Sequence, residues 1–336
     1  MPFTVTTRTQ PNTSRLDETI YTLAGPDQVA EVWPALGFNC FSWKVTESGR
    51  SLDLLYSDPA LFGDGRPTRS GIPVLFPFPN RIRDGRFTWD GRAHQLPLND
   101  PAGKNAIHGF ACRHPWRVVG QGADANGAWV TGQFRGSLDA PDSRDLWPAD
   151  YELTLTIRLG SGTLRLEAEV FNPDTKPLPF GLGYHPYFKL PFAPGGDAAP
   201  CLVQVPARSY WPLADSLPGG EKRSVDPARD LSAPRRYGDL KLDDVLTDVS
   251  TAPGADGSRV CGTVQGDAKV ALRLYCSPAF RELVVFTPPH RQAFCVEPYT
   301  CTTDAINLQA RGIDAGWLTL APGQRWSAVV EMRVAP

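Results

Sequence analysis

YELTLTIRLGSGTLRLEAEV, residues 151–170, alternates apolar and polar residues on both sides of its Gly160-Ser161-Gly162 turn. A period of two places every apolar side chain of a strand on the same face. Two such runs joined by a short glycine-containing turn are typical of an antiparallel hairpin. The stretch therefore predicts two long paired strands with one buried face and one face that is wet or covered by a second sheet.

Similar alternation recurs elsewhere, at residues 270–274 and again at residues 326–334. Further short strands are expected at residues 40–45, 51–56, 116–119, 128–134, 283–286 and 294–296. Polar, proline-rich connections are expected to form loops at residues 136–150, 193–200, 216–236 and 251–257. Convincing amphipathic helices of ten or more residues are absent, and at most a turn or two of helix is expected near Leu146 or Ala233.

Many short strands separated by turn residues favour a β-sandwich or barrel. The 33 prolines and 31 glycines show no fixed period, which excludes collagen. The sequence has no evident internal repeat, so a propeller is not expected. The prediction is an all-β fold, a large antiparallel β-sandwich, with residues 1–336 forming one domain.

Composition and charge narrow the possible partners. With 34 Lys and Arg against 36 Asp and Glu, the net charge of −2 gives no reason to expect a nucleic acid or an anionic membrane as partner. The sequence contains no run of about 18 apolar residues, so no membrane span is predicted, and the first residues show no export signal. Seven scattered cysteines include no Cys-x-x-Cys pair or zinc spacing, so a reduced cytoplasmic protein without a metal is expected.

Familiar catalytic signatures are missing from the chain. It contains no G-x-S-x-G, no P-loop, no H-E-x-x-H and no complete G-x-G-x-x-G. Serine hydrolases, nucleotide hydrolases and dinucleotide enzymes therefore have little support. His94, His114 and His290 stand in polar or proline-containing surroundings and are expected at the surface.

Ionisable residues stand instead in apolar segments that contain proline or glycine, at the points where strands should end. The segments are Phe76-Pro77-Phe78-Pro79-Asn80-Arg81-Ile82, Ala106-Ile107-His108-Gly109-Phe110, residues 180–188 around His185, and Phe294-Cys295-Val296-Glu297-Pro298-Tyr299-Thr300. A charge in such surroundings is costly unless it is paired or used. Taken singly, His185 could be a hydrogen-bonded core histidine and Arg81 a structural ion-pair partner. Together the segments offer a carboxylate, two imidazoles and a fixed positive charge.

The ordered segments resemble the signature of the aldose 1-epimerase, or galactose mutarotase-like, family over about residues 40–334. The resemblance is carried by Asn80-Arg81-Ile82, His108-Gly109, His185-Pro186-Tyr187-Phe188 and Glu297-Pro298. It implies a galactose mutarotase-like supersandwich with a sugar cleft across one face. It also implies interconversion of the α and β anomers of a monosaccharide, without cofactor or metal. The expected oligomeric state is a monomer or homodimer.

The resemblance further implies roles for individual residues. Glu297 takes the place of the general base on the C1 hydroxyl, and His185 that of the acid on the ring oxygen. Arg81 and His108 position the sugar, and Asn80 and Tyr187 belong to the same binding segments. A sugar-binding aspartate corresponds to Asp243 or Asp244, with Asp243 favoured by its distance from the following apolar residue. Aromatic residues in these segments suit either stacking on a pyranose or plain core packing: Tyr184, Tyr187, Phe188 and Tyr299.

Other functions remain open at this stage. The segment after His108-Gly109 is short, as in relatives that act on hexose 6-phosphates, and Arg83, Arg113 and Arg117 could clamp a phosphate or be solvated loop arginines. A non-catalytic carbohydrate-binding sandwich is a second alternative. A glycoside hydrolase or lyase that uses Glu297 with Asp243 is a third.

Overall fold

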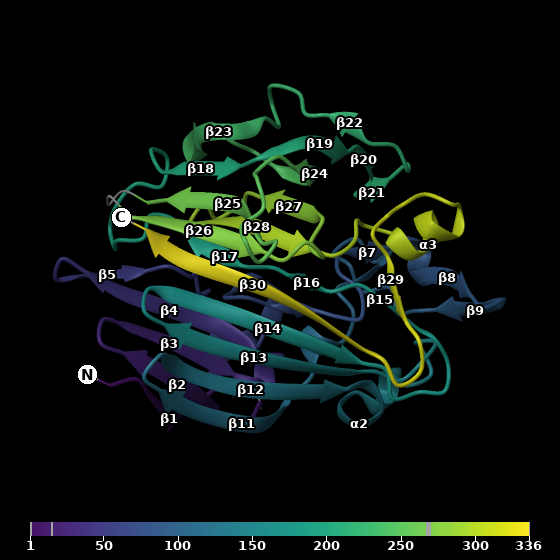
Figure 1. Cartoon of the computed structure of the whole chain (residues 1–336), viewed down its shortest axis with the longest axis horizontal. Helices are drawn as coiled ribbons and strands as arrows, with labels where there is room; N and C mark the ends of the chain where they lie inside the picture. Colours follow the sequence, from purple (N-terminus) through teal and green to yellow (C-terminus); the bar gives the residue numbers. More distant parts are fainter. Residues whose placement is uncertain (1, 15, 267–269, 336) are drawn as a thin grey trace.

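Three large antiparallel sheets dominate the computed structural model, which describes residues 2–14, 16–266 and 270–335 (Figure 1). The nine-stranded sheet contains, in spatial order, β11 (Arg117–Asp124), β12 (Gly127–Arg135), β13 (Glu152–Gly160), β14 (Thr163–Phe171), β30 (Arg325–Ala335), β26 (Ala271–Cys276), β25 (Arg259–Gln265), β18 (Leu202–Val205) and β23 (Leu231–Arg236). The five-stranded sheet contains β1 (Thr4–Thr9), β2 (Thr19–Gly25), β3 (Gln28–Trp33), β4 (Asn39–Glu47) and β5 (Arg50–Asp53). The all-β antiparallel prediction is therefore confirmed.

The third sheet carries most of the site described below. Its strands are, in spatial order, β22 (Arg223–Ser224), β19 (Ala207–Trp211), β24 (Asp243–Val249), β27 (Glu282–Phe286), β28 (Ala293–Tyr299), β16 (Gly183–Tyr184) and β6 (Val74–Leu75), with β17 (Tyr187–Lys189) also paired to β28. Smaller antiparallel pairs are β7 (Arg81–Ile82) with β10 (Ala106–Ile107), β8 (Arg86–Trp89) with β9 (Arg92–Gln95), β15 (Leu178–Phe180) with β29 (Leu318–Leu320), and β20 (Leu213–Ala214) with β21 (Leu217–Pro218).

Helices in the described residues are short. They are α1 (Leu61–Asp64), α2 (Gly136–Asp139) and α3 (Ala305–Ala310), with the 3-10 helices η1 (Pro34–Leu36), η2 (Pro67–Arg69), η3 (Arg83–Gly85), η4 (Ala111–Arg113), η5 (Pro141–Ser143) and η6 (Tyr237–Asp239). None of these described helices is long and apolar enough to cross a membrane.

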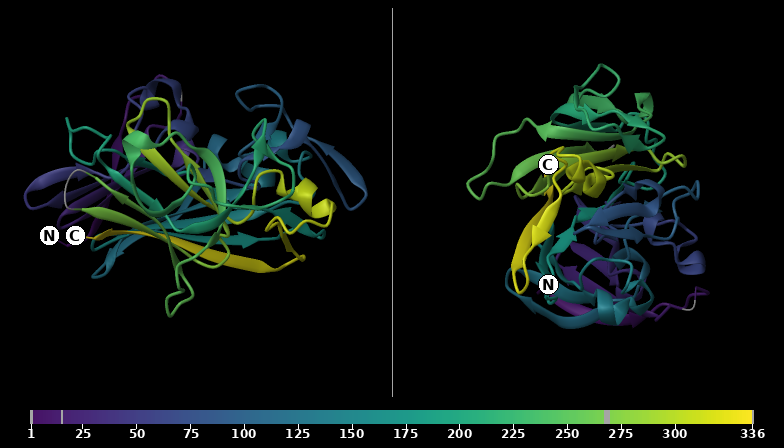
Figure 2. Two further views of the ribbon diagram at one scale, coloured as in Figure 1. Left: turned by 90° about the horizontal axis from the view of Figure 1, so that it is seen from above. Right: turned by 90° about the vertical axis from the view of Figure 1, so that its right-hand side faces the viewer.

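The five-stranded sheet and the third sheet both pack beside the nine-stranded sheet. The five-stranded sheet lies beside β11–β14, and the third sheet lies beside the β25–β18 end (Figures 1 and 2). Strand β30, drawn in yellow, runs between the two halves because it pairs with β14 on one side and β26 on the other (Figure 2). At the second layer Gly262 packs against Val296, where a Cβ on the glycine would lie 3.0 Å from the valine side chain.

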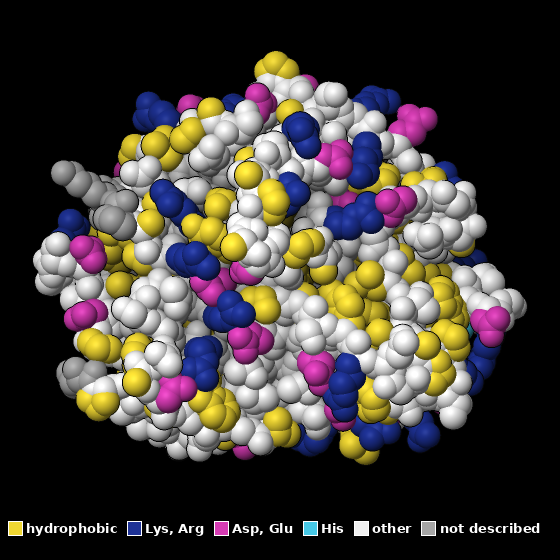
Figure 3. All heavy atoms as spheres, in the orientation of Figure 1, with side chains coloured by type: hydrophobic (Ala, Val, Ile, Leu, Met, Phe, Trp, Pro, Cys, Tyr) yellow, Lys and Arg dark blue, Asp and Glu magenta, His cyan; other side chains and the backbone are white. Residues whose placement is uncertain are grey.

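The 151–170 stretch folds as its alternation predicts. Strands β13 and β14 pair in register from Glu152 with Phe171 to Gly160 with Thr163. The apolar residues of both strands are buried in the largest core cluster, which also contains residues of the five-stranded and third sheets. Outward-facing Lys, Arg, Asp and Glu side chains are interspersed over the face seen in Figure 3, in keeping with the near-zero net charge.

Two local expectations are wrong. Residues 231–236 form the edge strand β23 rather than a loop, and Ala233 lies in that strand rather than in a helix. Pro234 is tolerated there because an edge strand leaves one row of N–H groups unpaired. Near Leu146 the chain forms the 3-10 helix η5 and a following turn, as expected. Helix α3 was not foreseen, because its six residues are too few to show a helical period.

Candidate active site

A cleft of about 540 Å³ lies over one face of strands β24, β27 and β28. It gathers six of the residues that the sequence singled out, from segments far apart in the chain: Asn80, Arg81, His108, His185, Asp243 and Glu297. The cleft also contains Val284 and Phe286 from β27, which give it an apolar wall. A small polar ligand can therefore meet both fixed charges and an apolar surface here.

Glu297 owes its position to the alternation of β28. Phe294 and Val296 point into the main core, whereas Glu297 and Tyr299 line the cleft on the opposite face. Glu297 is 1% exposed, and Tyr299 Oη donates a short hydrogen bond to its Oε2. That bond leaves Oε1 as the carboxylate oxygen available to other groups.

His185 lies between β16 and β17, where His185 and Pro186 interrupt the strand. Its backbone N–H donates to Pro73 O at 3.1 Å, and its ring stacks on Tyr187 at 4.5 Å between centroids. His185 Nε2 lies 3.3 Å from Glu297 Oε1, so the two groups are within reach of one shared proton. His185 Nδ1 is buried and has no hydrogen-bond partner in the described residues.

Burial opposes charge on both members of this pair. It raises the pKa of Glu297 well above its usual value, while the Tyr299 hydrogen bond and Arg81 act in the opposite direction. It lowers the pKa of His185 to about 3. Each direction favours the uncharged form, a neutral carboxylic acid beside a neutral imidazole. Polar groups that enter the cleft favour the ion pair instead, because they replace part of the lost solvation.

Asn80 and His108 face each other at the ends of β7 and β10. Both adopt left-handed backbone conformations, with φ of 53° and 65°. The His108 N–H donates to Asn80 O at 2.9 Å, and the Asn80 N–H donates to His108 Nδ1 at 3.2 Å. An Nδ1 that accepts a hydrogen bond leaves the proton on Nε2, so His108 offers a donor. Burial, His185 and Arg113 lower the pKa of His108, which keeps the ring neutral.

Gly109 explains why His108 reaches the cleft. Its φ is 60°, and a Cβ at this position would lie 2.2 Å from Phe76 O. The close approach fixes the loop against the Phe76 segment and requires glycine.

Arg81 is held in place rather than free. Its Nε lies 3.4 Å from Asp100 Oδ2 and its Nη1 donates to Asn80 Oδ1 at 3.2 Å. Asp100 is almost fully buried, with a 3% exposed side chain. Two anchors fix the guanidinium in the cleft wall, where its remaining N–H groups can meet an oxygen-rich ligand.

Asp243, and not Asp244, lines the cleft. Asp244 is instead bonded to Arg229, with Nε to Oδ1 at 2.6 Å. The side chain of Asp243 is exposed, but it lies in the concave wall of the cleft. Partial desolvation by the surrounding wall raises the pKa of Asp243, and the charge of Arg81 acts in the opposite direction.

Aromatic residues take mixed positions. Tyr299 lines the cleft, whereas Tyr187 is buried behind His185 and donates from Oη to Thr68 O at 2.5 Å. Tyr184 and Phe188 belong to the main core. The structure thus places Tyr187 in support of His185 rather than in the cleft lining.

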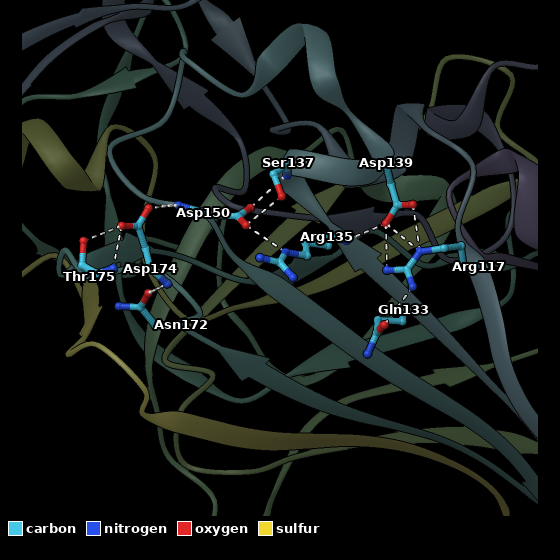
Figure 4. A network of polar contacts seen from close by, with 9 residues as sticks. All are labelled: Arg117, Gln133, Arg135, Ser137, Asp139, Asp150, Asn172, Asp174 and Thr175. Carbon is cyan, nitrogen blue, oxygen red and sulfur yellow. Dashed lines mark hydrogen bonds and ion pairs between the residues drawn. The ribbon is translucent and has the colours of Figure 1, made fainter.

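Arginines around the cleft differ from the expected set. Arg113 lines the cleft, but Arg83 is paired with Asp304 at 3.5 Å. Arg117, at the start of β11, is bound through Nε and Nη2 to Asp139 of helix α2, within the polar network of Figure 4.

Arg66 and Arg69 join Arg113 in the cleft lining and were missed by the sequence analysis. They lie at the short helix η2, and no motif marked that segment. Both are largely exposed and share one carboxylate, Asp64, at 3.4 and 3.9 Å.

Comparisons with known proteins identify the family of the chain. Residues 20–333 match the model of the aldose 1-epimerase family. The uncharacterized protein YphB of Escherichia coli is 24% identical over 275 residues, covering 80% of this chain and 86% of that protein. Galactose mutarotase of Rattus norvegicus is 30% identical over 161 residues, covering 47% of this chain and 44% of that protein.

The fold has a close structural counterpart. The crystal structure of a galactose mutarotase-like protein from Clostridium acetobutylicum superposes with a TM-score of 0.85 over 99% of both chains. The sequence identity is 22%, so this likeness concerns the fold alone. The predicted supersandwich is thereby confirmed.

Proposed function

The chain belongs to the aldose 1-epimerase family, and on that basis we propose that it interconverts the α and β anomers of an aldose in the cleft. One observation carries the proposal: Glu297 and His185, both buried, lie 3.3 Å apart in the cleft lining. Ring opening needs one proton removed and one delivered at two oxygens bonded to the same carbon. A carboxylate and an imidazole in contact meet that requirement.

The proton transfers balance over one turnover. Glu297 removes the proton from the C1 hydroxyl while His185 gives a proton to the ring oxygen, the C1–O bond of the ring breaks, and C1 becomes a carbonyl. Rotation about the C1–C2 bond turns the carbonyl over. The former ring oxygen, now a hydroxyl, then attacks C1 from the other side, returns its proton to His185, and Glu297 returns the first proton to O1.

Neighbouring groups support these steps. Arg81 stabilises the ionised form of Glu297 by its charge, and the Tyr299 hydroxyl does so by its hydrogen bond. His108 offers its Nε2 proton and Asp243 its carboxylate to sugar hydroxyls, which orients the ring. No step depends on a group other than these side chains.

Polarimetry of freshly dissolved α-D-glucose and α-D-galactose tests the proposal. The enzyme should accelerate the optical rotation change, and His185→Asn should lower kcat by about 100-fold, the usual contribution of a positioned acid. A change confined to KM would assign the acid role to another residue. Release of reducing ends from oligosaccharides without anomer exchange would favour a hydrolase instead.

A specific observation favours a phosphorylated aldose as the second candidate substrate. Arg66, Arg69 and Arg113 line the cleft, and their only ion-pair partner among the described residues is Asp64, which lies near Arg66 and Arg69. Guanidinium groups suit the oxygens of a phosphate dianion. Anomer exchange of glucose 6-phosphate, followed by NMR, should then be faster than that of glucose, and saturating inorganic phosphate should compete with it. Equal rates for both sugars would favour the neutral aldose.

A further inference from the structure

Cys295 stands on the catalytic face of β28. It lies two residues before Glu297, and side chains two residues apart in a strand point to the same side. Across the sheet Cys295 is in register with Phe286 and with Tyr187, and Phe286 is in register with Asp243. Because Phe286 and Asp243 line the cleft, the thiol points toward the floor beneath it.

Three different ligand atoms converge at this floor. A ring nitrogen of His185, Cys295 Sγ and a carboxylate oxygen of Glu297 all lie within 4.8 Å of one another, and all three residues are buried. His185 Nε2 and Glu297 Oε1 are 3.3 Å apart. In a tetrahedral zinc site, bonds of about 2.0–2.3 Å place neighbouring ligand atoms about 3.3–3.8 Å apart. The His185 and Glu297 atoms already have that spacing, and the thiol needs to move by at most about 1 Å.

The donor set selects the kind of cation. A thiolate, an imidazole and a carboxylate together suit Zn²⁺ and other thiophilic divalent ions, whereas Mg²⁺ and Ca²⁺ prefer oxygen ligands only. Three protein ligands leave a fourth position, which here faces the cleft. Of the charged groups nearby, Asp243 attracts a cation and Arg81 repels one, so the local charge does not exclude it.

We propose that His185, Cys295 and Glu297 form an inhibitory site for a thiophilic divalent cation such as Zn²⁺. The metal displaces the protons of these groups and occupies the nitrogen and oxygen atoms that exchange protons with the sugar. Inhibition is therefore reversible, competitive with substrate and stronger at higher pH. The predicted inhibition rests on the proposed anomer exchange, whereas the predicted metal binding does not.

The test uses the whole protein with Co²⁺ and Zn²⁺ as probes. One Co²⁺ per chain should bind and give the near-ultraviolet absorption of a cobalt thiolate. That absorption should vanish in Cys295→Ala and in Cys295→Ser, whose hydroxyl keeps the shape of the side chain but is a poor ligand. Cys301→Ala is the matched control, since Cys301 is equally buried but packs against Gly181. In anomer exchange, the Zn²⁺ concentration for half inhibition should rise at least about tenfold in both Cys295 variants.

The outcomes separate the two proposals. Co²⁺ binding without thiolate absorption, or equal Zn²⁺ inhibition of the wild type and both Cys295 variants, would overturn the metal site. Thiolate absorption that depends on Cys295, in a protein without anomer exchange, would support the metal site and overturn the proposed function. Mg²⁺ should leave the rate unchanged at concentrations where Zn²⁺ inhibits.

Discussion

Replacing Tyr299 by Phe removes a hydrogen bond from the carboxylate of Glu297 while the buried ring keeps its place. A hydrogen bond to a charged group contributes about 1.5–3 kcal/mol. Because the bond stabilises the ionised form, its loss raises the pKa of Glu297. At about 1.4 kcal/mol per pKa unit, the increase is about one to two units.

The pH dependence of kcat/KM for anomer exchange measures this change directly. Activity falls on the acidic side as the base of the free enzyme becomes protonated. In Tyr299→Phe that acidic limb should move up by about one to two pH units, which lowers the rate below the limb by about ten- to a hundredfold. On the plateau above the limb the rate should stay close to that of the wild type.

Tyr184→Phe is the matched control for this experiment. Tyr184 is buried to the same extent, but its hydroxyl has no hydrogen-bond partner among the described residues. The control should leave the acidic limb where it is. If Tyr299→Phe lowers the rate equally at every pH and does not move the limb, the hydroxyl does not tune Glu297 and the reasoning fails.

Three further predictions concern the rim, the loop and the core. Arg113→Ala should raise the KM for glucose 6-phosphate at least about tenfold and leave that for glucose within about twofold, as steady-state kinetics will show. Gly109→Ala should cost at least about 1–2 kcal/mol of stability and lower activity, because its Cβ meets Phe76 O; urea unfolding and polarimetry measure both. Burial raises the pKa of Glu282 to about 7 although the Trp211 indole donates to it at 2.8 Å. Its carboxylate therefore costs stability as pH rises from about 4.5 to about 7, up to about 3 kcal/mol, and urea unfolding of Glu282→Gln should lack that loss.

Period-two alternation was sufficient to predict β13, β14, β26 and β30, whereas the sequence analysis did not predict β1–β3, β18, β19, β24 or β25. The alternation is clear in β13 and β14 because one face of these strands is buried and the other is not. The polarity of each residue therefore indicates the face on which its side chain lies. Strand β23 escaped because it is a polar edge strand in which only Leu231 is buried. Alternation arises when every second side chain of a strand is buried, and in β23 one residue alone is buried, so no alternating pattern appears.

Proline and glycine made part of the site predictable, because they mark the strand ends beside His108 and His185. Glu297 was also expected at a strand end, but β28 continues through Pro298 to Tyr299, so that expectation is wrong. The rest depends on tertiary packing. Arg66 and Arg69 lie on a short helix without a motif, and reach the cleft only because the fold brings η2 beside β17.

Cys295 gave no sign of its position either, since one buried cysteine in an apolar run resembles the other six. Its place beside Glu297 follows from the strand alternation, but its distance to His185 follows from the pairing of β17 with β28. Pairing between segments about a hundred residues apart is not encoded in local periodicity.

Exchange NMR between the two anomers of an aldose, with the wild type and with Glu297→Gln, tests the proposed chemistry most directly. Gln keeps the size of the side chain but cannot accept the C1 proton. Anomer exchange should fall at least about 100-fold while the sugar still binds, as saturation-transfer contacts will show. Retention of more than about a tenth of the wild-type rate in Glu297→Gln would contradict a general base at this position.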